Sequence, residues 1–87
     1  LMYHAIIFHT PNCMKCKLTE KQLSQLMSTK MVLIDRLAET RMDIINYMES
    51  HGMVSSPLVR IYLGDKLVDE WNDFQVSKIK QWKGRVG

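Results

Sequence analysis

The segment AIIFHTPNCMKC, residues 5–16, places two cysteines directly after an apolar run and a turn. The apolar run predicts a first strand over His4–His9, because continuous apolar residues are typical of a strand that is covered on both faces. Such a strand is expected in the interior of its sheet. The tripeptide Thr10-Pro11-Asn12 predicts the turn that ends the strand.

A helix is expected to follow over residues 13–27, with Asn12 as its candidate N-cap. Its apolar side chains recur at spacings of three and four residues, which gives the helix an inner face. Cys13 then lies at the start of the helix, and Cys16 lies one turn later on the inner face. The cysteine pair is therefore predicted at the junction of the first strand and the first helix.

The rest of the chain alternates apolar runs with turn and cap signals, and it predicts five further elements. They are a strand at 31–35, a helix at 40–51, a strand at 58–63 that Pro57 opens, a strand at 66–71, and a helix at 74–83 that Asp73 caps. The order βαβαββα predicts an α/β fold with a four-stranded mixed sheet and helices on both faces. The final helix is expected to bury Val76, Ile79 and Trp82.

Gly64-Asp65 is a two-residue hairpin signal, which makes the last two strands antiparallel. Pairing about this turn predicts Arg60 opposite Asp69 and Ile61 opposite Val68. An ion pair and an apolar pair would then support the same register.

Length and composition narrow the class of protein. The 87 residues allow a single domain, 1–87, and they carry a formal charge of +3 with 46% hydrophobic residues. No apolar run approaches the ~20 residues of a membrane span, and no signal-peptide pattern is found, so we expect a cytoplasmic protein that does not bind membranes. Lysines and arginines are spread along the chain without regularly spaced aromatic residues, which argues against nucleic acid as a partner. We expect a monomer with Met2 as its natural start.

The two cysteines have the spacing of a reversible dithiol switch. Residues three apart on a first helical turn lie about 5–6 Å apart at Cβ, near disulfide geometry, and so small a loop stabilises the fold weakly. Unpaired N–H groups and the positive end of the helix dipole favour a thiolate at Cys13, as do the nearby Lys15 and Lys17. We therefore predict Cys13 as the nucleophile and Cys16 as the resolving thiol. No tightly bound cofactor is expected beyond the redox-active Cys13–Cys16 disulfide.

Other interpretations stay open at the level of sequence. The cysteines could pack as buried thiols without chemistry. They could also join His9 or His4 in a metal site, although structural zinc needs four ligands and the chain has no second Cys-x-x-Cys. Pro57 could simply open its strand, whereas we predict a cis Ser56–Pro57 bond beside the disulfide.

Taken together, these residues resemble the NrdH redoxins, glutaredoxin-like proteins that supply electrons to class Ib ribonucleotide reductase. Cys13-Met14-Lys15-Cys16 is similar to the redox motif of that family, Ser56-Pro57 to its cis-proline, and Trp71-Asn72-Asp73-Phe74 to its Trp-Ser-Gly-Phe-Arg-Pro segment. The resemblance implies a thioredoxin-like (glutaredoxin) fold and a dithiol electron carrier that reduces protein disulfides, with ribonucleotide reductase as the substrate. The residues expected to contact the substrate are Met14, Lys15, Ser55, Ser56, Pro57, Trp71 and Phe74.

The chain departs from that family at Asn72-Asp73 and Gln75-Val76, where the family has Ser-Gly and Arg-Pro, so we expect an altered hydrogen-bond network there. It also lacks the Gly-Gly pair of glutaredoxins proper, and Thr10 stands where many of them have a lysine that holds glutathione. Asp73 is expected to repel a glutathione carboxylate. Thioredoxin reductase is therefore the expected electron donor. A glutathione-dependent glutaredoxin, or a non-catalytic binding module that uses the Pro57 groove, is the alternative.

Overall fold

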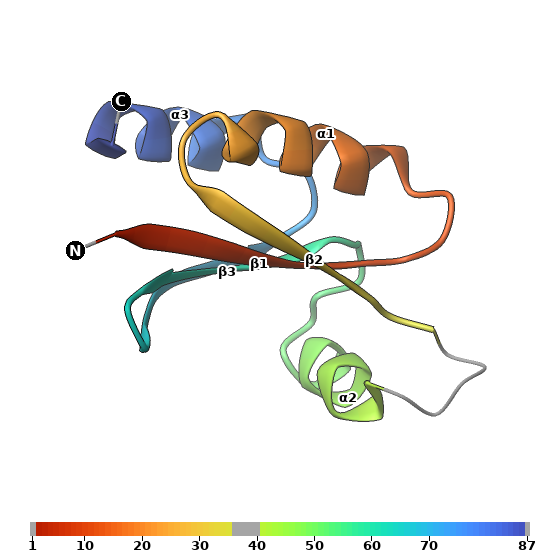
Figure 1. Cartoon of the computed structure of the whole chain (residues 1–87). Coiled ribbons are helices and arrows are strands. Elements are labelled where there is room, and N and C mark those ends of the chain that lie inside the picture. Colours follow the sequence, from red (N-terminus) through yellow and green to blue (C-terminus); the bar gives the residue numbers. More distant parts are fainter. Residues whose placement is uncertain (1, 36–40, 87) are drawn as a thin grey trace.

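A four-stranded mixed sheet forms the centre of the protein in a computed structural model that describes residues 2–35 and 41–86 (Figure 1). Strand β1 (Tyr3–His9) pairs parallel with β2 (Ser28–Leu33) and antiparallel with β3 (Leu58–Leu63). Strand β4 (Lys66–Asn72) pairs antiparallel with β3, so the strand order is β2-β1-β3-β4. The predicted interior position of the first strand is confirmed.

Helices cover both faces of this sheet, as the sequence predicts. Helices α1 (Met14–Ser24) and α3 (Val76–Val86) lie over one face, and α2 (Met42–Ser50) lies over the other (Figure 1). The larger core cluster includes Trp82 and joins the sheet to α1 and α3. The smaller cluster joins the sheet to α2, and its buried members are Phe8, Ile34, Ile44, Ile45, Met48 and Leu58. None of the helices that the structure describes is long and apolar enough to cross a membrane.

The first crossover is shorter than predicted. Helix α1 ends at Ser24 and not at Met27, and β2 begins at Ser28 and not at Met31. The reason is the parallel pairing with β1, which starts at His4 opposite Ser28 and so takes up the residues just after the helix. The predicted start of the second helix at Thr40 falls outside the described residues.

The register predicted for the last two strands is wrong by one residue. Arg60 pairs with Glu70 and Ile61 with Asp69, while Tyr62 pairs with Leu67, so that β4 contains a bulge at Val68. A bulge adds one residue to a strand and leaves it unpaired. Arg60 consequently forms its ion pair with Glu70, with 2.8 Å between Nε and Oε2.

The final helix begins two residues later than predicted. Asp73 does not cap it: this residue has a φ of 72°, and its Oδ1 accepts a hydrogen bond from the backbone N–H of Phe74 (2.8 Å). The backbone N–H groups of Lys78 and Ile79 in the first turn of α3 donate to the Gln75 carbonyl. Ile79 and Trp82 are buried as predicted, whereas Val76, which was expected inside, is 52% exposed.

Candidate active site

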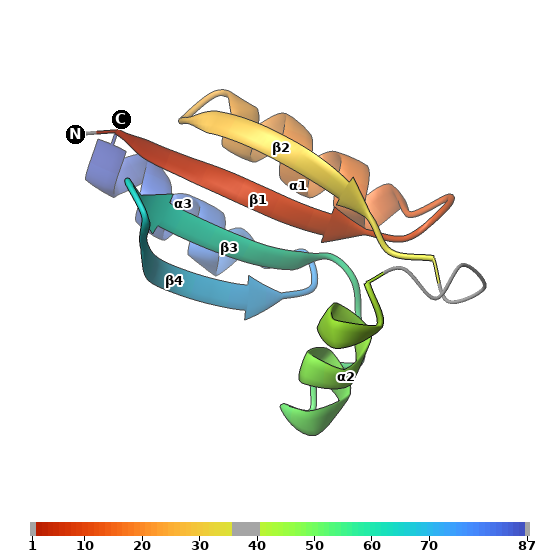
Figure 2. The ribbon, with the colours of Figure 1, turned by 60° about the horizontal axis from the view of Figure 1, so that its bottom comes forward.

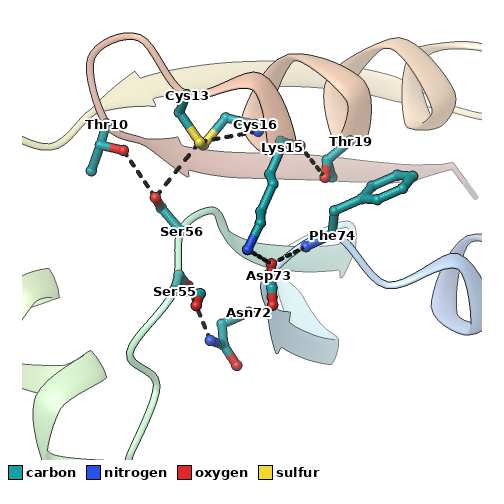
Figure 3. Close-up of a disulfide and its surroundings, with 10 residues drawn as sticks. All are labelled: Thr10, Cys13, Lys15, Cys16, Thr19, Ser55, Ser56, Asn72, Asp73 and Phe74. Carbon is teal, nitrogen blue, oxygen red and sulfur yellow. Dashed lines mark hydrogen bonds and ion pairs between the residues drawn. A yellow bond between two sulfur atoms is a disulfide. The ribbon is translucent and has the colours of Figure 1, made fainter.

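Cys13 and Cys16 form a disulfide at the start of α1, directly after the turn that ends β1 (Figure 3). Their Cα atoms lie 5.2 Å apart. Asn12, the expected N-cap, instead takes a left-handed conformation with a φ of 54°, which asparagine tolerates better than most residues. Cys13 itself occupies the N-cap position in an extended conformation. Its Sγ accepts a hydrogen bond from the backbone N–H of Cys16 at 3.2 Å.

The two sulfur atoms have different surroundings. Cys16 is 1% exposed and faces the interior with Thr19, whereas Cys13 is partly exposed. Met14, between them, is 66% exposed. Only the Cys13 side of the disulfide is therefore open to an incoming thiol or disulfide.

The loop before β3 faces the disulfide, and its Ser56–Pro57 peptide bond is cis. Ser56 Oγ lies 3.7 Å from Cys13 Sγ and 2.9 Å from Thr10 Oγ1 (Figure 3). The Pro57 side chain is fully buried, so this loop has a fixed base beneath its partly buried serines. The sequence indicated Ser56 but gave no sign that Thr10 would meet it, because the two residues are 46 positions apart.

The segment after β4 holds the same loop from its other side. The Asn72 side chain donates from Nδ2 to the Ser55 carbonyl (3.0 Å), and the Asp73 backbone N–H donates to the Pro57 carbonyl (2.9 Å). Gln75 in turn donates from Nε2 to the Asn72 carbonyl (2.7 Å). The residues that depart from the NrdH pattern thus build a hydrogen-bond network of their own.

An ion pair crosses the site between α1 and this segment. Lys15 Nζ lies 3.0 Å from Asp73 Oδ1, and Figure 3 shows the lysine reaching toward Asp73 and not toward the sulfur atoms. The hydrogen bond from Lys15, assisted by the Phe74 N–H, lowers the pKa of Asp73 below its ordinary value. The positive charge of Lys15 is therefore shared with Asp73, which reduces what it adds to a thiolate at Cys13.

Two of the residues expected to contact substrate lie elsewhere. Trp71 is 4% exposed, because its place on β4 turns its ring into the larger core cluster. Phe74 is partly buried against that cluster, and its ring points away from the disulfide in Figure 3. Val54, which the sequence analysis did not select, is 94% exposed beside the site. A single apolar residue in a loop belongs to no periodic pattern, so no sequence signal marks it.

An open groove runs past the exposed cysteine. Its walls are residues 10–15 on one side and 54–56 on the other, and its volume is about 380 Å³. A second pocket of about 490 Å³ adjoins it beneath α2 and shares Thr10, Val54 and Ser56 with it. The groove and the pocket together form a surface of apolar and polar side chains next to Cys13, and this surface is much larger than a single thiol group.

The histidines considered as metal ligands do not gather at the cysteines. His4 stacks on Tyr62 with 5.4 Å between the ring centroids, at the other end of β1 from the disulfide. Within residues 2–35 and 41–86 no three His, Cys, Asp or Glu side chains form a group that could hold a metal ion.

Solved structures share this architecture. An Escherichia coli NrdH-redoxin, described as a glutaredoxin-like protein with a thioredoxin-like activity profile, matches with a TM-score of 0.64 at 19% identity, over 90% of this chain and 92% of its own. Fasciola hepatica thioredoxin matches with a TM-score of 0.62 at 13% identity, over 99% and 82% of the two chains. Chlamydomonas reinhardtii thioredoxin f2 matches with a TM-score of 0.61 at 14% identity, over 97% and 78%. No protein-family model and no curated protein matches the sequence. The chain has a thioredoxin-like fold, as predicted.

Proposed function

We propose that this protein is a thiol–disulfide oxidoreductase, a dithiol electron carrier that reduces protein disulfides. The observation that carries the proposal is the asymmetry of the Cys13–Cys16 pair: one sulfur is exposed in a groove at a helix N-terminus, and the other is buried behind it. A disulfide that only stabilised the fold would need no groove and would close a longer loop. Two merely packed thiols would both be buried.

The reaction follows from that asymmetry. In the reduced protein the Cys13 thiolate attacks one sulfur of the substrate disulfide, and the first substrate thiolate leaves. The Cys16 thiol then gives up its proton and attacks Cys13 Sγ, and the second substrate thiolate leaves. Two electrons pass to the substrate, whose thiolates take up two protons, and the Cys13–Cys16 disulfide remains. A reductase of the thioredoxin reductase class returns the two electrons from NADPH.

The backbone at Ser56 offers an attachment point for an extended substrate segment. The carbonyl groups of Ser55 and Pro57 already accept hydrogen bonds from Asn72 and Asp73. The N–H and carbonyl of Ser56 have no hydrogen-bond partner within the part of the chain that the structure describes. A substrate strand that paired with Ser56 would bring its disulfide to Cys13, in the manner of strand addition.

The charges at the site favour a protein reductase over glutathione as the electron donor. A glutathione site needs basic groups that are free to bind its carboxylates. Lys15, the basic side chain beside Cys13, is held by Asp73, and the hydroxyl of Thr10 is held by Ser56. We further propose, from the resemblance to NrdH redoxins, that the substrate is a ribonucleotide reductase and that the protein acts in the cytoplasm as a monomer.

The test is a disulfide-reductase assay coupled to NADPH oxidation, run with thioredoxin reductase and separately with glutathione and its reductase. We expect turnover with thioredoxin reductase, none in Cys13→Ser, and a trapped mixed disulfide with the substrate in Cys16→Ser. Absence of turnover with every donor would contradict the proposed activity and favour a binding module. Faster turnover with glutathione would make the protein a glutathione-dependent glutaredoxin.

A further inference from the structure

The hydroxyl groups of Thr10 and Ser56 form a chain that ends on the exposed sulfur. Ser56 Oγ stands between the other two atoms, 2.9 Å from Thr10 Oγ1 and 3.7 Å from Cys13 Sγ (Figure 3). Thr10 follows β1, whereas Ser56 precedes β3, so the antiparallel pairing of these strands brings the two side chains together. Both residues are partly buried, which limits competition from water.

The disulfide fixes the direction of the hydrogens in this chain. Cys13 Sγ carries no hydrogen when it is bonded to Cys16, so Ser56 must donate to it. A serine hydroxyl has one hydrogen, and Ser56 therefore accepts from Thr10 at its own oxygen. The hydrogen bond from Thr10 polarises the Ser56 hydroxyl, so Ser56 becomes a stronger hydrogen-bond donor to the Cys13 sulfur.

We propose that Thr10 and Ser56 are positioning residues that form a hydroxyl relay and stabilise the Cys13 thiolate in the reduced protein. Reduction leaves Cys16 as a thiol, and Cys13 releases its proton to solvent to become a thiolate. A thiolate is a much stronger acceptor than a disulfide sulfur, and it would accept from Ser56 Oγ and from the Cys16 N–H. Ser56 thus acts on the nucleophile itself, in addition to the backbone contact proposed above.

The charged groups around Cys13 give its thiolate little net stabilisation. Lys15 on α1 faces Asp73 from the segment after β4, and the two charges largely compensate each other. Glu49 on α2 lines the adjoining pocket with Thr10 and Ser56 and is exposed to solvent, which screens its charge. Lys17, one turn along α1, is exposed to solvent, which screens its charge. Uncharged donors are therefore the main local support for the thiolate besides the helix N-terminus.

The test measures the alkylation rate of the reduced Cys16→Ser protein against pH, so that Cys13 is the one reacting thiol. We expect Ser56→Ala to raise the apparent pKa of Cys13 by about one unit, since a hydrogen bond to a charged group has roughly that effect. The rate at the alkaline plateau should rise roughly threefold, because nucleophilicity increases with thiol pKa. Ser56→Thr, which keeps the hydroxyl, should stay near the parent.

Thr10→Val removes the outer hydroxyl and keeps the shape of the side chain. It should raise the apparent pKa of Cys13 by about half a unit in the parent, because the Ser56 donor is weakened. In the Ser56→Ala background it should add nothing, since Thr10 acts only through Ser56. The matched control is Ser24→Ala, which removes a hydroxyl at the far end of the same helix and should leave the titration unchanged.

Three outcomes would overturn the relay. The first is an unchanged titration in Ser56→Ala, and the second is a Ser56→Thr protein that behaves like Ser56→Ala. The third is a Thr10→Val shift of equal size in both backgrounds, which would show that Thr10 acts by another route. The inference rests on the proposed thiol chemistry, yet alkylation needs no partner protein. If the variants shift the pKa of Cys13 as expected but the protein has no reductase activity, the proposed function is contradicted and the relay still holds.

Discussion

The Lys15–Asp73 ion pair connects the first turn of α1 with the loop after β4. The Lys15 side chain is 56% exposed and that of Asp73 is 37% exposed, so solvent screens the pair and it contributes little to the free energy of unfolding. Its effect is on the local charge. With Lys15 bound to Asp73, neither group presents a full charge to a ligand at Cys13, and the expected repulsion between Asp73 and a glutathione carboxylate is weakened as well.

Replacement of Lys15 by methionine, which has a similar length, should raise the pKa of Asp73 toward the ordinary value of 3.8. The reason is that the hydrogen bond from Lys15 is the largest cause of the lowered pKa. Because the folded pKa of Asp73 is depressed, its ionisation favours the folded state above the unfolded pKa, and that preference is lost as the pH falls through the folded pKa. Carboxyl NMR titration measures the change. Lys17→Met is the control, and an unmoved Asp73 titration in Lys15→Met would refute the pair.

The positions of single residues at the candidate site could be predicted from the sequence where the signal was local. Cys13 and Cys16 could be identified from their spacing at a helix start, and Ser56 from the proline after it. Thr10 could not be identified, because its partner Ser56 is distant in sequence. Trp71 was misplaced because an aromatic residue in a strand can lie on either face, and a shift of one residue exchanges the faces. Its burial depends on the bulge in β4, for which the sequence gives no sign.

The bulge at Val68 determines what β4 presents to α3. It places Asp69 on the face of the sheet that α3 covers, where Oδ2 accepts hydrogen bonds from Trp82 Nε1 (2.8 Å) and Lys78 Nζ (2.7 Å). Glu70 then lies on the opposite face with Arg60. Asp69 and Glu70 are both acidic, so either register gives Arg60 an acidic partner. For this reason the prediction from the sequence paired Arg60 with the wrong residue. The elements could be predicted, but the exact pairing of β4 could not.

Asp69→Asn should lower the free energy of unfolding by about 2 kcal/mol at neutral pH, because a part-buried charge-assisted hydrogen bond to Lys78 is lost. Burial alone would raise the pKa of Asp69, but the hydrogen bonds from Lys78 and Trp82 outweigh it and hold the pKa below 3.8. The stabilisation is therefore complete above the unfolded pKa and disappears as the pH falls through the lower folded pKa. Urea unfolding at a series of pH values measures it.

The control for this change is Asp65→Asn in the exposed hairpin turn, which should alter the free energy of unfolding by less than about 0.5 kcal/mol. A difference between parent and Asp69→Asn that stayed constant from neutral to strongly acidic pH would show that the charge of Asp69 is not the source of the effect.

At the scale of the whole molecule, the site forms where three strand ends meet. β1 ends at His9, β3 begins at Leu58 and β4 ends at Asn72, and antiparallel pairing brings these points to the same end of the sheet (Figure 2). The resemblance to NrdH redoxins implied that Ser56-Pro57 faces the disulfide. The order βαβαββα alone did not, because it does not fix the direction of β3 relative to β1, and that antiparallel pairing is what brings the cysteines and the proline loop together.

Two strongly exposed apolar side chains lie at the groove beside Cys13, and they predict where a protein substrate binds. Met14 and Val54 line the groove at Cys13 and are 66% and 94% exposed. Leu67 is 45% exposed beside the β3–β4 turn, at the opposite end of the sheet (Figure 2). Solvated apolar side chains next to a reactive group are typical of an interface that a partner covers.

We therefore expect Met14→Gln and Val54→Thr, which nearly keep the side-chain shapes, each to lower the rate of protein-disulfide reduction about fivefold, equivalent to roughly 1 kcal/mol of binding. Reduction of a small aliphatic disulfide should fall much less, because so small a substrate buries little of this surface. Leu67→Gln serves as the matched control and should affect neither rate. Equal losses on the large and the small substrate would place the effect on the Cys13 thiolate, and an equal loss in Leu67→Gln would rule out the groove as the docking surface.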